Sequence, residues 1–384
     1  MRWTLMILVF CFLGCRQQEN RNNTSQAVAE EPDSAESVRF ARGFQISKTS
    51  EGITLIRVLQ PWPGADRPFE YALVPKEAFQ KGLVDNKQYD AVIEVPVERV
   101  VVTSTTHIPA LEALGVADRL VGFPGTDYIS SENTRGRIES GEVANLGNNE
   151  MMNTEMTLSI RPDLVVGFGI AARNKAYETL IRSGIPVVYN GDWTEQTPLG
   201  KAEWIKFFAP FFQLEERADS LFDSIVASYT NARELAGRVQ QIPVVMSGAL
   251  YKDIWYAPGG DSWAAEFIRD ANGSYLWDDT EDTGSLSLSL ESVLSRAKEA
   301  DIWISPSQFT SYGEMEGANP HYKEFRAFRD RKVYTYALCK GETGGLTFFE
   351  LGPNRPDLIL RDLIHIFHPE ILPDHEPTFF KPLQ

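Results

Sequence analysis

The sequence contains little cysteine, little histidine and fewer basic than acidic residues. Its three cysteines are Cys11, Cys15 and Cys339, and cleavage of a leader before Cys15 would leave too few thiols for an internal disulfide, a structural zinc or an iron–sulfur site. Four of the five histidines lie at or beyond His321, which disfavours a bare zinc or manganese site. The net charge of −16 argues against a nucleic-acid partner, because phosphate binding needs clustered Lys and Arg.

Signatures of catalysis are also missing. The chain contains no G-x-S-x-G, H-E-x-x-H, Walker A or G-x-G-x-x-G motif. Ser247 follows a predicted strand, but a nucleophile elbow needs glycine two positions earlier, where Val245 stands. A hydrolase, the main rival class, is therefore disfavoured, and we expect no enzymatic activity.

The first residues have the pattern of a targeting segment. Arg2 precedes the apolar run Leu5 to Leu13, which is too short to span a bilayer and suits a signal peptide. Phe12-Leu13-Gly14-Cys15 resembles the bacterial lipobox, in which the acylated cysteine becomes the new N-terminus. We interpret residues 1–14 as a lipoprotein signal peptide, Cys15 as lipidated and 15–37 as a disordered polar tether. The protein would then be anchored on the periplasmic or extracytoplasmic side; the alternative is a simple secretory signal.

The remaining chain predicts an α/β protein in two parts. Residues 38–97 are rich in strand-type runs and form an N-terminal extension, and from 98 onward apolar strands alternate with helices. All-apolar strands in such repeats indicate mainly parallel sheets covered on both faces. The scheme runs through 98–213, which with the extension would form an N-terminal lobe (38–213), and starts again over 241–384, a C-terminal lobe with a terminal helix and tail.

One long helix is predicted between these parts. Residues 213–239 carry apolar residues at steps of three and four, with charged residues at the other positions, and Pro243 follows. We expect a connecting helix over 214–240 that bridges two lobes. The alternative is an ordinary long helix inside a single domain.

Ligands of parallel sheets bind beyond the carboxyl ends of the strands. Several side chains in the predicted strand exits suit a flat, large ligand, because aromatic rings can stack on it. The candidate ligand-binding residues are Thr105, His107, Trp193, Tyr251, Trp255, Tyr256, Phe309, Tyr312 and Glu342. Packing in the core or between lobes is the alternative for each ring, and helix capping or solvent contact for His107. Glu342 could meet a cation or hold its glycine-rich loop.

Three segments carry a resemblance to a known family. They are ERVVVTSTTHIPALEALGVADRLVGF, LGNNEMMNTEMTLSIRPDLVVGF, and WAAEFIRDANG followed by LSLESVLSRAKEADIWI. Together they resemble the helical-backbone substrate-binding proteins of bacterial ABC importers, which carry ferric siderophores, haem and cobalamin. The chain departs from the family pattern at Ala271-Asn272 and at Glu299-Ala300, and residues before 98 lie outside the family core.

The resemblance implies two Rossmann-like lobes bridged by one helix, with the ligand between them. It places Glu155 and Glu266 where the family has its permease-docking glutamates, one on each lobe. Two acidic groups would fix the orientation of the protein on a membrane partner with matching arginines. Alternatively, a Glu in a first helical turn merely offsets the macrodipole.

We therefore predict an extracytoplasmic solute-binding lipoprotein of an ABC importer. It would capture an iron–siderophore or related metal chelate between its lobes and deliver it to the permease, as a monomer without a cofactor or metal site of its own. The alternatives are cobalamin or haem binding by the same mechanism, or a surface lipoprotein that captures glycan or peptide.

Overall fold

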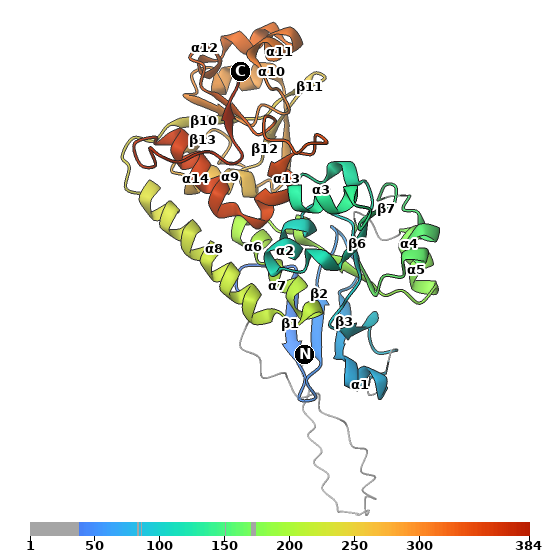
Figure 1. Ribbon diagram of the computed structural model, residues 1–384. Coiled ribbons are helices and arrows are strands. Elements are labelled where there is room, and N and C mark those ends of the chain that lie inside the picture. Colours follow the sequence, from blue (N-terminus) through green and yellow to red (C-terminus); the bar gives the residue numbers. More distant parts are fainter. Residues whose placement is uncertain (1–37, 83, 86, 150, 170–173) are drawn as a thin grey trace, which may run out of the picture. The chain divides into compact units, whose positions relative to one another are not determined.

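The computed structural model describes residues 38–384 except 83, 86, 150 and 170–173 (Figure 1). The predicted signal peptide, lipidated Cys15 and tether lie outside the described residues. Within the described ranges, the helices are all too short or too polar to cross a bilayer.

A four-stranded sheet forms the N-terminal extension. Its strands have the order β1-β2-β3-β4; the first three pair antiparallel and β4 runs parallel to β3. In β2, Ile56 and Val58 point into the core while Arg57 between them is exposed. Phe44 of β1 packs on Trp204. The extension therefore shares the core of the first lobe. The elements are β1 (Phe44–Lys48), β2 (Thr54–Val58), β3 (Phe69–Pro75), α1 (Lys76–Gln80) and β4 (Ala91–Val95).

The first lobe is built on a five-stranded parallel sheet of order β7-β6-β5-β8-β9. Its central strand β5 consists of three fully buried valines, because both faces of the sheet are covered. The strands are β5 (Val100–Val102), β6 (Leu120–Phe123), β7 (Ala144–Asn145), β8 (Leu164–Phe168) and β9 (Val187–Asn190). The helices are α2 (His107–Leu114), α3 (Glu132–Glu139), α4 (Thr154–Ile160), α5 (Lys175–Arg182), α6 (Pro198–Ala202) and α7 (Ile205–Phe208).

A single 22-residue helix, α8 (Glu215–Ala236), connects the two lobes. Ala218 and Phe222 in its first half belong to the core of the first lobe. Tyr229, Ala232 and Ala236 in its second half belong to the core of the second lobe. Because one helix contributes to both cores, the predicted bridge between two α/β lobes is confirmed.

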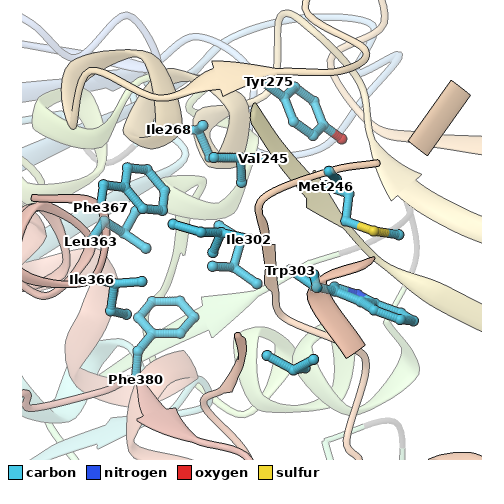
Figure 2. Close-up of a cluster of buried hydrophobic side chains, with 14 of the residues drawn as sticks. Val245, Met246, Ile268, Tyr275, Ile302, Trp303, Leu363, Ile366, Phe367 and Phe380 are labelled. Atoms are coloured by element: carbon cyan, nitrogen blue, oxygen red, sulfur yellow. The ribbon is translucent and has the colours of Figure 1, made fainter. Parts of the chain in front are cut away.

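The second lobe repeats the plan with a sheet of order β13-β10-β15-β16-β17, parallel except for β17 from the C-terminal tail. Figure 2 shows its core, in which Val245 and Ile302 from the sheet meet Leu363 and Phe367. The strands are β10 (Val244–Ser247), β13 (Ser274–Tyr275), β15 (Ile302–Ile304), β16 (Val333–Thr335) and β17 (Lys381–Pro382). The helices are α9 (Trp263–Asp270), α10 (Leu290–Ala297), α11 (Tyr312–Ala318), α12 (Arg326–Arg329), α13 (Thr347–Leu351) and α14 (Pro356–Phe367).

A second, antiparallel sheet in this lobe was not predicted. It consists of β11 (Ala249–Tyr251), β12 (Ile254–Pro258) and β14 (Ser285–Leu288). The sequence indicates one strand through Gly248, but the chain turns there with φ +87° and enters a hairpin. A Cβ at position 248 would lie 1.9 Å from the carbonyl oxygen of Tyr256, so only glycine allows β12 to approach this closely.

Candidate functional site

The second lobe contains a cavity of about 420 Å³ at the carboxyl ends of its parallel strands. Ser247 ends β10 and Gly248 follows it, Ser305 follows β15 and Tyr336 follows β16, and all of them line the cavity. The buried parallel strands end together here and leave short polar turns at the edge of the sheet. This edge is where a parallel α/β sheet binds its ligand.

Aromatic rings form much of the cavity wall. Tyr336 and Phe348 are stacked, with ring centroids 4.9 Å apart and an interplanar angle of 14°. Burial raises the pKa of the Tyr336 phenol, so that group stays protonated and neutral. The other aromatic wall residues are Tyr251, Tyr256, Trp263, Phe267, Phe349 and Phe380.

The wall is neutral as well as aromatic. Within the described part of the chain, no charged side chain lines this cavity. Its polar groups are hydroxyls such as those of Ser305 and Ser307, together with the backbone of the strand exits. Such a wall favours a ligand with flat or apolar surfaces whose charge is compensated within the ligand itself.

The first lobe places two predicted residues at the corresponding edge of its own sheet. Trp193 lies in the 3-10 turn Asp192–Thr194 after β9, and its indole nitrogen donates to the carbonyl of Gly169 at 3.2 Å. Thr105 lies half-buried in the turn between β5 and α2. Both positions agree with the strand exits expected from the sequence, while their contact with a ligand stays a prediction.

His107 is buried in the first lobe. Its ring is fully buried, packs against Phe208 with centroids 5.2 Å apart, and lies near Asn190 and Asp192. Burial lowers the pKa of His107 to about 4, so the ring is neutral at physiological pH. In this conformation the imidazole is part of the packing beneath the strand exits and has no free surface for a ligand. Among the described residues, no group of three or more His, Cys, Asp or Glu is placed to hold a metal ion.

Three further predicted ligand contacts lie in or against the core of the second lobe. Trp255 is fully buried, packs on Trp303 and donates its indole N–H to the carbonyl of Ser247 at 3.1 Å. Tyr312 is 8% exposed and its ring contacts Phe328. Phe309 is half-buried against the same core. Trp255 and Tyr312 are thus packed in the core and Phe309 lies at its margin, whereas Tyr251 and Tyr256 line the cavity; contact of these rings with a ligand stays a prediction.

Glu342 is exposed in the loop between β16 and α13. This loop approaches the first lobe: the Thr343 hydroxyl donates to the carbonyl of Asp127 at 2.8 Å. A Cβ at Gly341 would lie 2.5 Å from Cα of Ser130. The glycine-rich loop is therefore a contact between the lobes, while the role of Glu342 in ligand binding or in holding the loop stays a prediction.

The periplasmic binding protein family matches residues 100–337, which is more than half of the chain. The chain belongs to this family. Its members are binding proteins without catalytic activity that serve ABC transporters, and the fold of two α/β lobes is theirs.

Relatives of this periplasmic binding protein include an uncharacterized lipoprotein of Methanocaldococcus jannaschii, 25% identical over 99% of this chain and 96% of the relative. Among solved structures, a periplasmic heme-binding protein from Pseudomonas aeruginosa matches with TM-score 0.56 and 17% identity, over 75% of this chain and 98% of that one. A possible iron-binding, periplasmic solute-binding protein from Staphylococcus epidermidis matches with TM-score 0.54 and 19% identity, over 71% and 98%. At these identities the structural matches establish the fold alone.

The two candidate docking glutamates of this binding protein lie in comparable places. Each lies in the first turn of a helix whose N-cap side chain accepts a backbone N–H: Glu155 in α4, capped by Asn153, and Glu266 in α9, capped by Ser262. Glu155 is exposed and Glu266 is half-buried. Burial, with Asp270 one turn further along, raises the pKa of Glu266 to about 7.

Sequence reasoning missed several wall residues of the cavity. Trp263 and Phe267 come from α9, where their spacing predicts only an amphipathic helix face. Phe348 and Phe349 lie at the end of a predicted strand exit, but the helix α13 that presents them was not predicted. The available signal was the pair of adjacent aromatic residues separated from the glycine-rich loop by two residues.

Proposed function

We propose that this protein is the substrate-binding component of an importer for an iron–siderophore or a related metal chelate. The observation that supports it best is the neutral aromatic cavity at the carboxyl edge of the second lobe's sheet. A chelate whose metal charge is already balanced by its own donors presents flat, weakly charged surfaces to such a wall. The protein itself then needs no metal ligands.

The names of relatives support the proposed solute class and the lipid anchor. The Staphylococcus epidermidis protein is named as possibly iron-binding and the Pseudomonas aeruginosa protein as heme-binding. Two relatives from Methanocaldococcus jannaschii are named lipoproteins, which supports acylation at Cys15 and a membrane-anchored carrier on the extracytoplasmic side. Haem and cobalamin are the second candidates, since both are large, flat chelates that the same wall would accept.

A ligand panel tests the proposal through stability. Ferric hydroxamates, ferric catecholates, haem, cobalamin, oligosaccharides and peptides are each added to the protein, and its thermal unfolding is followed. A true ligand at one hundred times its dissociation constant should raise the unfolding free energy by about 2.7 kcal/mol. Stabilisation by one chelate class and by no sugar or peptide is expected. Stabilisation by an oligosaccharide or peptide alone would overturn the proposal, and mass spectrometry of the protein from its own organism checks the result.

The cavity wall gives a second expected result. Replacing Tyr256, which is 39% exposed, by Ala should weaken binding of the chelate found in the panel by about tenfold, because a stacking ring contributes about 0.5–1.5 kcal/mol beyond its buried area. Isothermal titration measures the change. Ile254→Ala is the matched control, since Ile254 is exposed on the same strand and does not line the cavity. Equal losses in both variants would place the ligand elsewhere.

A further inference from the structure

The short helix α13 faces both the ligand cavity and the first lobe. Phe348 and Phe349 line the cavity, and the next side chain, Glu350, points to the other lobe. Filling the cavity therefore acts on the same five-residue helix that carries Glu350.

Glu350 makes direct polar contacts from α13 to the first lobe. One carboxylate oxygen accepts the backbone N–H of Ser130 at 2.5 Å and the other accepts that of Ser131 at 2.9 Å. Ser131 is the N-cap of α3, so the carboxylate sits at the N-terminal end of an eight-residue helix. Glu350 is buried, with only 3% of its surface exposed to solvent.

The surrounding contacts make this interface tight. The side-chain amide of Asn354 donates to the carbonyl of Thr106 at 2.8 Å, directly after α13. On the other side, a Cβ at Gly345 would lie 2.3 Å from the carbonyl oxygen of Tyr128. Glu350 is therefore enclosed by backbone of both lobes, and separating the lobes would expose it to water.

We propose that Glu350 is a latch that joins the lobes and couples their closure to occupation of the cavity. The role of the latch in solute capture rests on the proposed function. The contact itself does not, because it joins residues of this chain alone.

The pH dependence of closure at this latch follows from the pKa of Glu350 in the closed and open states. Burial, followed by the nearby carboxylate of Glu112, raises the pKa of Glu350 from 4.5 to about 7, although the N–H groups of Ser130 and Ser131 act in the opposite direction. Once the lobes separate, the exposed carboxyl returns toward its ordinary pKa. Between pH 4.5 and about pH 7, Glu350 therefore binds a proton more tightly in the closed state than in the open state. The stability that this gives to the closed state is fully present at low pH and is lost as pH rises through about 7. Between pH 6 and pH 8 the closing equilibrium should fall about tenfold.

The other charged groups nearby do not reverse this direction. Glu112 of α2 is held by the hydroxyls of Ser131 and Thr134, and as a like charge it favours protonation of Glu350. Arg135 of α3 donates to the carbonyl of Thr126. Behind α13, Arg355 is held by Asp357. His107, also on α2, is buried with a lowered pKa and is neutral over this range. The exposed Glu132 and Glu342 are solvated on the same two surfaces.

Hydrogen–deuterium exchange of the full chain without ligand tests the latch. The protection of the amides at 130–134, corrected for intrinsic exchange at each pH, should be about tenfold greater at pH 6 than at pH 8. Glu350→Gln should abolish this pH response, because the amide carries no titratable proton. Glu139→Gln, which removes a charge from the exposed end of α3, should keep it.

A second variant covers the case in which Glu350→Gln folds poorly. Gly345→Ala leaves Glu350 intact but places a methyl group against Tyr128, so protection at 130–134 should be low at both pH values. Unchanged wild-type protection between pH 6 and pH 8, or greater protection at pH 8, would overturn the latch. If the exchange results are as expected but no chelate stabilises the protein, the proposed solute is refuted while the latch is supported.

Discussion

Exchanging Glu155 or Glu266 for arginine should abolish solute uptake while ligand affinity stays within about twofold of the wild type. Both glutamates lie in first helical turns, one on each lobe, outside the cavity wall. If permease arginines receive them, reversing one charge replaces an attraction by a repulsion at an interface, which costs several kcal/mol. Uptake by cells expressing the importer, and titration of the purified protein, are the two measurements.

The matched control tests the alternative that these glutamates only stabilise their helices by offsetting the helix dipole. Glu291 is also an acidic, exposed residue in the first turn of an N-capped helix, α10. Glu291→Arg makes the same change to the helix dipole. We expect its uptake to be normal. A loss of uptake as large as in the Glu155 and Glu266 variants would mean that helix stability, and not docking, explains all three.

The half-buried position of Glu266 adds a pH dependence to docking. With its pKa raised to about 7, Glu266 is ionised above that value and neutral below it. Binding to the permease in membrane vesicles should therefore weaken as pH falls from 8 to 6, and Glu266→Gln should remove the response. If Glu266 docks on a permease, acid would weaken this docking while it tightens the proposed latch at Glu350.

The fold could be predicted largely from local patterns. The apolar steps of α8 predicted its position to within a few residues, because a 22-residue helix leaves a long periodic signal. The four strands of the extension follow from runs of β-type residues, and β2 also alternates between buried and exposed side chains. These signals are local in sequence, and tertiary contacts reinforce rather than override them.

The cavity wall could be predicted only in part. Tyr251, Trp255 and Tyr256 fall in one predicted strand exit, but the hairpin that begins at Gly248 decides which rings turn inward: Trp255 pairs with Leu250 on the core face, and Tyr256 faces outward. That register depends on one glycine turn, and a slip of one residue would reverse the faces. Glu350 gave no signal, because its partners are backbone amides about 220 residues away in sequence.

Loss of the Glu203 carboxylate should destabilise the protein more than any surface change. Glu203 is fully buried just after α6 and accepts the backbone N–H groups of Arg39, Phe40 and Ala41. It also lies 3.4 Å from the ammonium of Lys206, itself mostly buried. Glu203→Ala removes the acceptor of three N–H groups and one of the partners of Lys206, which keeps Asp219 at 3.0 Å, so the unfolding free energy should fall by about 3 kcal/mol. Denaturant unfolding measures the loss, with the exposed Glu216→Ala as the control.

A second readout locates the damage. The three N–H groups belong to the first described residues of the extension, which lead into β1. If Glu203 fixes this segment to the first lobe, its removal should expose the bonds after Arg39 and Arg42 to trypsin before the rest of the chain unfolds. Wild-type resistance at these bonds in Glu203→Ala, with lowered global stability, would show that the carboxylate serves Lys206 and the core instead. The extension would then be held mainly by Phe44 and the sheet face behind it.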